Sequence, residues 1–339
     1  MLRILHDTKY DFVKYWKAAA LGTIAFIALG IVLLGVHAAR HNGQALNKSV
    51  EFTGGTAVQL KFAHDAPADV VRSAVDEAGF AGAEVTTFGD AATYMIKAPP
   101  KEDQAAATDA AAVGESIARV LTQRLPDNPV RVEQSQSVGP RVGAELQTKA
   151  ITAILISFVV TLIYLAIRFE WRFGVAAVVA TAHDILTTLA FLAMMRLEIS
   201  LTVVAAILTV IGYSLNDTII IFDRVRENLR KQRKESLRDV LNRSINETLP
   251  RSILTHVTVA AATLSLLIFA GEVIRPFSWV MLFGIVTGTF SSIYIAGPVL
   301  LWIERRWPRN AGGKAGSGAS SAKAAPTRPT SPRTPVGAR

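Results

Sequence analysis

The segment VIGYSLNDTIIIFDRVREN, residues 210–228, begins as an apolar helix and continues as a charged one. Asn216 and Asp217 lie inside the apolar half, and Arg224 follows Asp217 by seven residues, or about 10 Å of helix. A carboxylate in such surroundings is costly unless it is paired or protonated. Asp217 is therefore a candidate functional group. The fold depends on whether the apolar blocks of the chain cross a membrane.

Hydrophobic residues make up 50% of the 339-residue chain and are concentrated in long blocks. A helix of about 20 apolar residues crosses a hydrocarbon core of about 30 Å, and each block is about long enough to do so. The first block ends near VHAAR and could be a cleaved signal, but it is longer than a typical signal core, which favours an uncleaved anchor. The chain is therefore predicted to be a polytopic α-helical membrane protein with six spans, at residues 18–36, 150–167, 173–195, 199–222, 252–270 and 277–302.

Basic residues set the orientation of the spans. The segment 224–251 has nine Lys and Arg against four acids, whereas the segment 38–149 has eleven against fourteen. Both termini are therefore expected in the cytoplasm, with the long segment outside. The predicted parts are a cytoplasmic N-terminus (1–17), a first span (18–36), a periplasmic α+β domain (37–149), a five-helix remainder of the bundle (150–302) with a cytoplasmic basic loop (224–251), and a basic disordered cytoplasmic tail (303–339).

The outer segment reads as a small α+β domain. TAVQLKF, residues 56–62, alternates apolar and polar residues like a half-buried strand, and PADVVRSAVDEAGF, residues 67–80, has a helical apolar face that ends at Gly79. The whole pattern is β-α-β-β-α-β, the ferredoxin-like unit, with its other elements at AEVTTF, TYMIKA, residues 113–125 and VRVEQSQSV. The tandem glycine of EFTGGT has the wrong spacing for a phosphate loop and reads as a turn or bulge before the first strand.

The composition argues against catalysis and against a bound cofactor. The chain has no cysteine, its six histidines show no metal-ligand spacing, and the outer segment contains no catalytic set of residues. We therefore expect no enzyme activity, no cofactor and no metal site. The tail from Asn310 carries only basic charges without a stacking aromatic residue, so nucleic-acid binding has no support. The tail is expected to be disordered and solvated, with contact to anionic lipid as the alternative.

Ionisable groups also occur in two other blocks. Asp184, beside His183, lies near the middle of the third block, and Arg251 opens the fifth block, ahead of His256. A structural hydrogen bond to a neighbouring helix is the alternative to a functional role for the acids, and topology alone explains an arginine at a cytoplasmic helix end. The polar residues recur at three- and four-residue steps, which places them in stripes. The stripes are Thr181, Asp184, Thr187 and Thr188; Tyr213 and Ser214 before Asp217; and Arg251, Thr255 and Thr258.

Three striped helices are expected to face one another rather than lipid. They would bring acids from two helices toward a base from the third, and protonating a carboxylate would break such a pair. The residues therefore predict a proton or ion path. Gly284 and Gly288 in the sixth block give a weaker signal of close helix approach. Residues 236–249 predict an amphipathic helix with a capping box at Ser236, which either lies on the membrane surface or packs beneath the bundle.

The motifs also carry a family resemblance. GYSLNDTIIIFDRVREN followed by NETLPRSILT closely resembles the SecF family of the bacterial Sec protein translocase, in the resistance–nodulation–division superfamily. Supporting matches are EFTGGT after the first block, SVGPRVGAELQTKA before the second, RFEWRF between the second and third, and AHD in the third, so that the resemblance covers about residues 10–305.

The resemblance implies an accessory subunit in the bacterial inner membrane. Such proteins form a complex with SecD and use the proton-motive force at a late step of the export of unfolded preproteins through SecYEG, with YajC as a further candidate partner. Asp217 would then be a proton-path carboxylate and Arg251 its cationic partner, while Asp184 matches the acidic position of the third span. The supporting polar residues would be His183, Tyr213, Asn216 and Thr255.

The chain has six predicted spans where the superfamily's working unit has twelve, so the resemblance implies that another chain supplies the other half. Two rival interpretations remain. One is a half-transporter of the same superfamily that exports a small molecule or a lipid, although such exporters usually carry larger outer modules. The other is a scaffolding membrane protein whose buried charges are structural.

Overall fold

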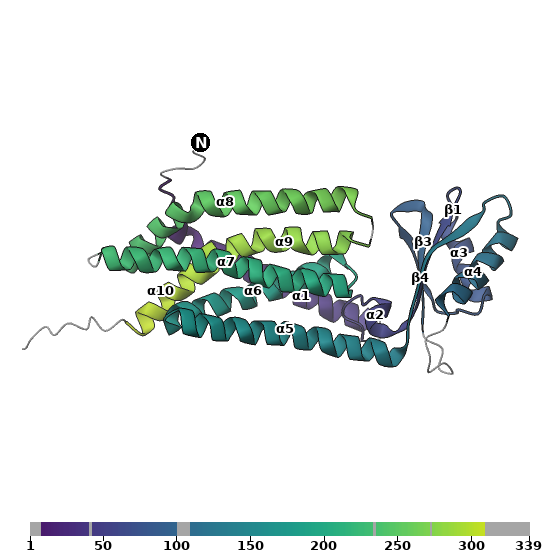
Figure 1. Cartoon of the computed structure of the whole chain (residues 1–339), viewed down its shortest axis with the longest axis horizontal. Helices are drawn as coiled ribbons and strands as arrows, with labels where there is room; N and C mark the ends of the chain where they lie inside the picture. The colour runs from purple at the N-terminus through teal and green to yellow at the C-terminus, as the bar shows by residue number, and fades with distance from the viewer. Residues whose placement is uncertain (1–7, 41–42, 100–108, 233–234, 272, 309–339) are drawn as a thin grey trace, which may run out of the picture.

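The computed structural model describes residues 8–40, 43–99, 109–232, 235–271 and 273–308. The helices lie side by side in an elongated bundle, and a small domain with a β-sheet lies at one end of it (Figure 1). The predicted tail lies almost wholly outside the described residues, although its first residues, up to Arg306, continue a helix.

Six helical segments in the described part of the chain are long and apolar enough to cross a membrane, which confirms the prediction of six spans. These helices are longer than the predicted apolar blocks, because a helix can continue past the membrane as long as its backbone hydrogen bonds are formed. They are α1 (Trp16–Arg40, after the 3-10 turn η1, Phe12–Tyr15), α5 (Pro140–Arg168), α6 (Trp171–Met195), α7 (Leu201–Lys231), α8 (Leu237–Phe269), and α9 (Arg275–Ser291) continued by the π-helical turn η2 (Ser292–Ala296) and α10 (Gly297–Arg306).

The outer domain has the predicted β-α-β-β-α-β order. Its four strands form an antiparallel sheet in the order β2-β3-β1-β4. A short helix, α2 (Val50–Thr53), precedes the first strand and was not predicted. The elements are β1 (Gly55–Phe62), α3 (Ala68–Glu77), β2 (Glu84–Phe88), β3 (Asp90–Ala98), α4 (Ala110–Arg124) and β4 (Val130–Val138).

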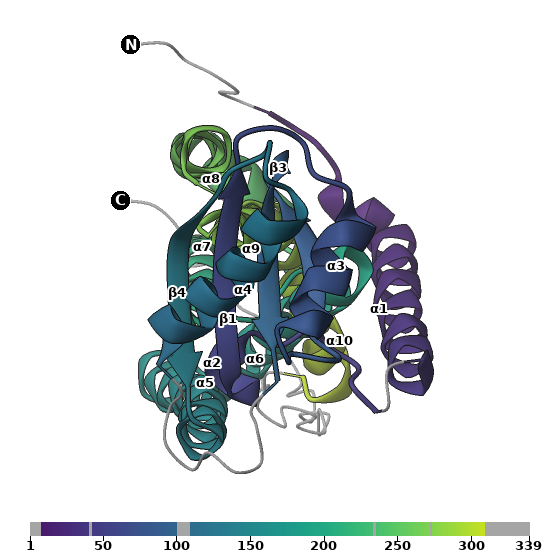
Figure 2. The same cartoon turned by 90° about the vertical axis from the view of Figure 1, so that its right-hand side faces the viewer.

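Helices α3 and α4 cover one face of the sheet (Figure 2). Val58, Leu60 and Ile96 of the sheet are fully buried against Val71 and Ile117 of the two helices. The opposite face of the sheet looks toward the bundle: Gln59, Met95 and Gln136 line a cavity of about 160 Å³ together with residues from the outer ends of α7 and α9. The outer domain is thus seated over the bundle with its uncovered sheet face inward.

The tandem glycine forms the junction between domain and bundle. Gly54 and Gly55 have φ angles of 74° and 115°, which confirms a turn before the first strand and which side chains other than glycine adopt with strain. A Cβ on Gly143 of α5 would lie 2.8 Å from the Gly54 nitrogen, and one on Gly54 would lie 2.8 Å from the Cα of Pro140. Glycines therefore let the two connections to the outer domain pass each other in backbone contact.

Helices α6, α7 and α9 form the buried centre of the bundle, whereas α1, α5 and α8 are largely exposed at its periphery. The Gly284 and Gly288 step does mark a close approach of α7 and α9: a Cβ on Gly284 would lie 2.2 Å from a methyl group of Val210, and one on Gly288 would lie 2.9 Å from the Cβ of Ser214. The two glycines, whose spacing is only weak evidence of close helix packing, thus lie at a tight contact between α7 and α9.

Residues 237–249 are not a separate helix but the first part of α8, which runs on through Pro250. The predicted cap is present, because the Ser236 side chain accepts from the Asp239 nitrogen at 3.2 Å. Val240, Leu241 and Ile245 are buried in one cluster with Phe173 and Leu300. Of the two alternatives left open by the sequence, the structure supports packing beneath the bundle.

Candidate functional site

Asp217 lies on the face of α7 that meets α8 and is 3% exposed. Its Oδ1 accepts a hydrogen bond of 2.5 Å from the hydroxyl of Ser252 on α8. Its Oδ2 is buried and has no hydrogen-bond partner among the described residues. One oxygen of the carboxylate is thus held by the neighbouring helix, and the other is available to a proton or to a donor that moves toward it.

Aromatic and imidazole groups extend this site along α8. The rings of Tyr213 and His256 pack edge to face at 5.2 Å between centroids, and the Tyr213 hydroxyl donates to the carbonyl oxygen of Thr255 at 3.0 Å. His256 Nδ1 contacts the carbonyl oxygen of Ser252, while its buried Nε2 has no partner in the part of the chain that the structure describes. A second titratable group therefore lies one helical turn from the serine that holds Asp217.

Asp184 of α6 is more deeply buried, at 1% exposure, and is better satisfied. Its Oδ2 accepts from the hydroxyls of Ser214 on α7 and of Ser291 on α9, the latter at 2.9 Å. Its Oδ1 lies 3.1 Å from Nδ1 of His183. This carboxylate joins the three central helices at one point, which fits a group that positions helices better than one that exchanges protons freely.

The two carboxylates are connected through the start of the π-helical turn. Ser291, which binds Asp184, is followed by Ser292, whose hydroxyl lies 2.8 Å from that of Thr218, the residue after Asp217. Turns of π-helix inside α-helices are frequent at functional sites. The surroundings of Asp217 and Asp184 are thus joined in the structure by two consecutive serines of the sixth span.

The sequence interpretation missed Ser252, Ser291 and Ser292. The signal was present, since these hydroxyls interrupt apolar blocks, and Ser291 and Ser292 do so in succession. A hydroxyl in an apolar helix usually bonds to a carbonyl of its own preceding turn, as Thr181 does here with Ala177 at 3.0 Å, so such residues rarely identify a site by themselves.

The predicted stripes meet in part. Those of α6 and α7 meet as expected through Asp184 and Ser214, but α8 turns Ser252 and His256 toward α7. Arg251, Thr255 and Asn216 are exposed on the outer side of the helix pair. Among the described residues the Arg251 guanidinium forms no ion pair, so its pairing with Asp217 stays a prediction.

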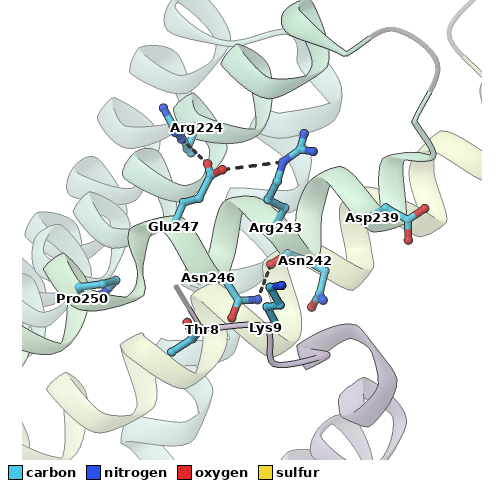
Figure 3. Close-up of a pocket in the computed structure, with 9 residues that line it drawn as sticks. All are labelled: Thr8, Lys9, Arg224, Asp239, Asn242, Arg243, Asn246, Glu247 and Pro250. Carbon is cyan, nitrogen blue, oxygen red and sulfur yellow. Dashed lines mark hydrogen bonds and ion pairs between the residues drawn. The ribbon is translucent and has the colours of Figure 1, made fainter. Parts of the chain in front are cut away.

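Charged residues lie at the end of the same helix pair that is farther from the β-sheet domain (Figure 1; Figure 3). Glu247 of α8 accepts from Arg224 Nε at 2.5 Å and lies 3.8 Å from Arg243 Nε. Asn246 accepts from the Tyr10 nitrogen at 2.9 Å and thereby ties the N-terminal segment to α8. These residues border a cavity of about 590 Å³ that also reaches Pro250, two residues before Ser252. Within the described ranges, no three His, Cys, Asp or Glu side chains cluster as they would around a metal ion.

Comparisons with known proteins agree with this architecture of a multi-pass helical membrane protein. The family profile described as "Protein export membrane protein SecD/SecF, C-terminal" matches residues 119–306. Protein translocase subunit SecF of Gemmatimonas aurantiaca is 58% identical over 314 residues, which cover 91% of each chain. The SecF subunit of Escherichia coli O157:H7 is 36% identical over 294 residues, 86% of this chain and 87% of that one.

A solved structure is similar as well. The crystal structure of SecDF from Thermus thermophilus, described as a translocon-associated membrane protein, matches 90% of this chain with a TM-score of 0.74 and 32% identity. The match spans 40% of the SecDF chain, so this chain corresponds to less than half of that protein. The chain belongs to the SecF family of protein translocase subunits. Its function is that of an accessory subunit in protein transport across a membrane.

Proposed function

We propose that this chain, together with SecD, couples the proton-motive force to a late step of preprotein export through SecYEG, with YajC as a further partner. It does so in the bacterial inner membrane, with both termini in the cytoplasm and the βαββαβ domain in the periplasm. The observation that carries the proposal is that only one oxygen of the buried Asp217 carboxylate has a hydrogen-bond partner among the described residues. That oxygen is fixed by Ser252 of a second helix.

The exposed face beside Asp217 supports the need for a second chain. Asn216, Arg251 and Thr255 are polar, and they lie in spans at a surface that lipid would otherwise cover. Polar groups in a membrane are costly unless a neighbouring helix satisfies them. A partner helix from SecD at this face would shield these residues and contribute groups to the proton path. The 40% coverage of the SecDF chain agrees with such a division between two polypeptides.

The geometry suggests how protonation moves a helix. Consecutive residues of an α-helix point about 100° apart, so the side chains of Arg251 and Ser252 leave α8 in directions that differ by that angle. An ionised Asp217 attracts the guanidinium of Arg251 and favours rotation of α8 that brings it inward. A protonated Asp217 has no such attraction and is satisfied by the Ser252 hydroxyl seen here. Asp184 holds α6, α7 and α9 together while α8 moves, and Tyr213, Thr255 and His183 support the polar surroundings.

Motion of α8 has a direct route to the periplasm. The loop after α8 leads to α9, and the start of α9 at Pro276 borders the cavity beneath the sheet. The ends of α7 and α9 therefore lie next to the uncovered face of the sheet. A shift of these helices would displace the domain. The alternative of a half-transporter for a small molecule or a lipid has no comparable feature that favours it.

The test is export of a secreted preprotein in cells whose sole copy of this chain carries Asp217→Asn. We expect normal membrane levels and normal co-purification with SecD, but slow export that no longer responds to the proton-motive force. Asn216→Asp/Asp217→Asn keeps the number of acids and serves as the matched control, since the carboxylate then lies on the exposed side. Normal export in the Asp217→Asn cells would refute the proton path, and loss of the complex would instead support a scaffolding role.

A further inference from the structure

A groove of about 530 Å³ lies at the cytoplasmic end of the bundle, between the end of α5 and the extension of α7 beyond the apolar block. Its first α7 residue, Asp223, follows Asp217 by six residues along the same helix, and it lines the groove together with Arg168 from the end of α5. Four cations and two carboxylates line it, which leaves an excess of two positive charges: Arg168, Arg226, Arg230 and Lys231 against Asp223 and Glu227.

Two arginines of the groove, Arg168 and Arg226, are held in position by neighbouring side chains, yet their guanidinium groups keep N–H donors for a ligand. The guanidinium groups of Arg168 and Arg226 lie 5.4 Å and 5.8 Å from the centroid of the Phe169 ring, which is buried and fixes them. Both approach Asp223, at 3.5 Å and 4.0 Å, longer than the hydrogen bonds of about 2.8 Å typical of tight ion pairs. The shared carboxylate therefore leaves several N–H groups of each guanidinium available to a further acceptor.

The groove lies where a membrane surface would be. Ile163 and Ile167, on the turns of α5 before Arg168, are 55% and 82% exposed, a degree that lipid contact explains. At the same end of the bundle, Trp171 and Trp302 each pack against Trp307 at 6.0 Å between ring centroids. Tryptophans of this kind mark the level of the lipid headgroups.

We propose that this groove binds the phosphate of an anionic phospholipid from the cytoplasmic leaflet, with its acyl chains along the exposed face of α5. Guanidinium groups match phosphate oxygens in geometry and charge. The excess positive charge favours lipids with net negative charge over zwitterionic ones, whose cationic end it repels. This site concerns lipid selection and is independent of the proton path at Asp217.

The experiment titrates the purified full chain in detergent with phosphatidylglycerol or phosphatidylcholine and counts bound lipids by native mass spectrometry. We compare the wild type with Arg226→Gln/Arg230→Gln, and with Arg72→Gln/Arg131→Gln, which removes the same charge from the surface of the outer domain. The site variant is expected to bind phosphatidylglycerol roughly tenfold to thirtyfold more weakly, since each basic residue near a membrane surface contributes about fivefold. The control variant is expected to match the wild type.

Arg230→Gln alone, at an exposed position, is the second variant if the double variant unfolds at a lower temperature than the wild type, and it should lose roughly fivefold. Equal binding by wild type and site variant would overturn the proposal, as would equal affinity for phosphatidylcholine. Full displacement of the lipid by millimolar inorganic phosphate would assign the groove to free phosphate instead. A photoreactive residue in place of Arg230 that captures a polypeptide in cells, and no lipid, would assign it to a protein partner and would equally overturn the proposal.

Discussion

The hydroxyl of Ser252 and Oδ1 of Asp217 are 2.5 Å apart, although the two residues are 35 positions apart in the chain and lie on different helices. This bond determines which side of α8 faces the carboxylate in the structure. It places Arg251, the neighbour of Ser252, on the exposed side. The state shown is therefore one in which a hydroxyl, and not the predicted arginine, satisfies Asp217.

Removal of that hydroxyl should change energy coupling more than assembly. In Ser252→Ala, the Asp217 carboxyl loses a donor worth about 1 kcal/mol, which corresponds to roughly a fivefold shift between the two orientations of α8. We expect the protein to accumulate normally and the response of export to the proton-motive force to weaken by about that factor. Ser265→Ala, whose hydroxyl bonds to its own helix at Ala261, is the control. An unchanged response would show that Ser252 does not hold Asp217 during export.

The contact of α7 with α9 predicts a difference between two glycines. In Gly284→Ala the new methyl group would lie 2.2 Å from a methyl group of Val210, and the helices must separate. Such overpacking typically costs about 1–3 kcal/mol and lowers the temperature of unfolding. Gly22→Ala in α1 meets no atom within 4 Å and should be neutral or stabilising, because alanine favours a helix by up to about 1 kcal/mol. Thermal unfolding of both purified variants in detergent decides this, and equal stability would contradict the close contact.

Tyr94 in the outer domain predicts a dependence on pH. Its hydroxyl donates to the carbonyl of Ala66 at 2.7 Å, and burial, with a smaller effect of Asp65, raises the pKa of Tyr94 above its usual value near 10. Because the pKa is raised, the contribution of the protonated Tyr94 hydroxyl to the free energy of unfolding is complete below about pH 10. It is lost as the pH rises through the pKa of Tyr94 in the folded protein.

Tyr94→Phe should therefore cost about 1 kcal/mol at pH 8, because the Ala66 carbonyl loses its donor, and should reduce the loss of stability between pH 8 and pH 10.5. Proteolysis of the full chain in urea, followed at fragments of residues 55–98, measures both effects. Tyr164→Phe, on the exposed side of α5, is the matched control. A Tyr94→Phe protein that loses stability with pH as steeply as the wild type would exclude ionisation of Tyr94 as the cause.

Hydropathy predicts the spans because lipid imposes length and composition, but it does not give the ends of the helices. Helix α7 continues to Lys231 and α8 begins at Leu237, well beyond their apolar blocks, since backbone hydrogen bonds continue in water. The outer fold was predictable for a related reason. The alternation in residues 56–62 and the helical spacing of Val71 and Val75 match a sheet with one face covered.

The site was predictable in part. The burial of Asp184 and Asp217 follows from their apolar neighbours, and the structure confirms that both are buried. The rotation of α8 could not be predicted, because Arg251 and Ser252 differ by about 100° around the axis and both settings bury some polar group. Ser291 was missed because its role depends on the approach of α9 to α6, a tertiary relationship that the local sequence does not contain.

The ion pair between Lys97 and Glu198 predicts how firmly the outer domain is held. Lys97 of β3 and Glu198 of the α6–α7 loop are 2.7 Å apart between Nζ and Oε2, and the Lys97 side chain is 13% exposed. The pair crosses the cavity beneath the sheet, so breaking it should let the domain separate from the bundle. A partly buried pair of this kind contributes about 1 kcal/mol, enough to change the ratio of seated to separated domain roughly fivefold.

The measurement is a double-mutant cycle with Lys97→Met and Glu198→Gln, read by the distance between nitroxide labels at Gln136→Cys and Thr202→Cys. The chain has no native cysteine, so labelling is confined to these positions. Each single substitution should broaden the distance distribution, and the double variant should add little more, because the pair is already broken. Lys61→Met breaks a pair with Glu133 inside the outer domain and should leave the distance unchanged. Purely additive effects would show that Lys97 and Glu198 act separately, and the domain would then be held by its glycine junction with α5.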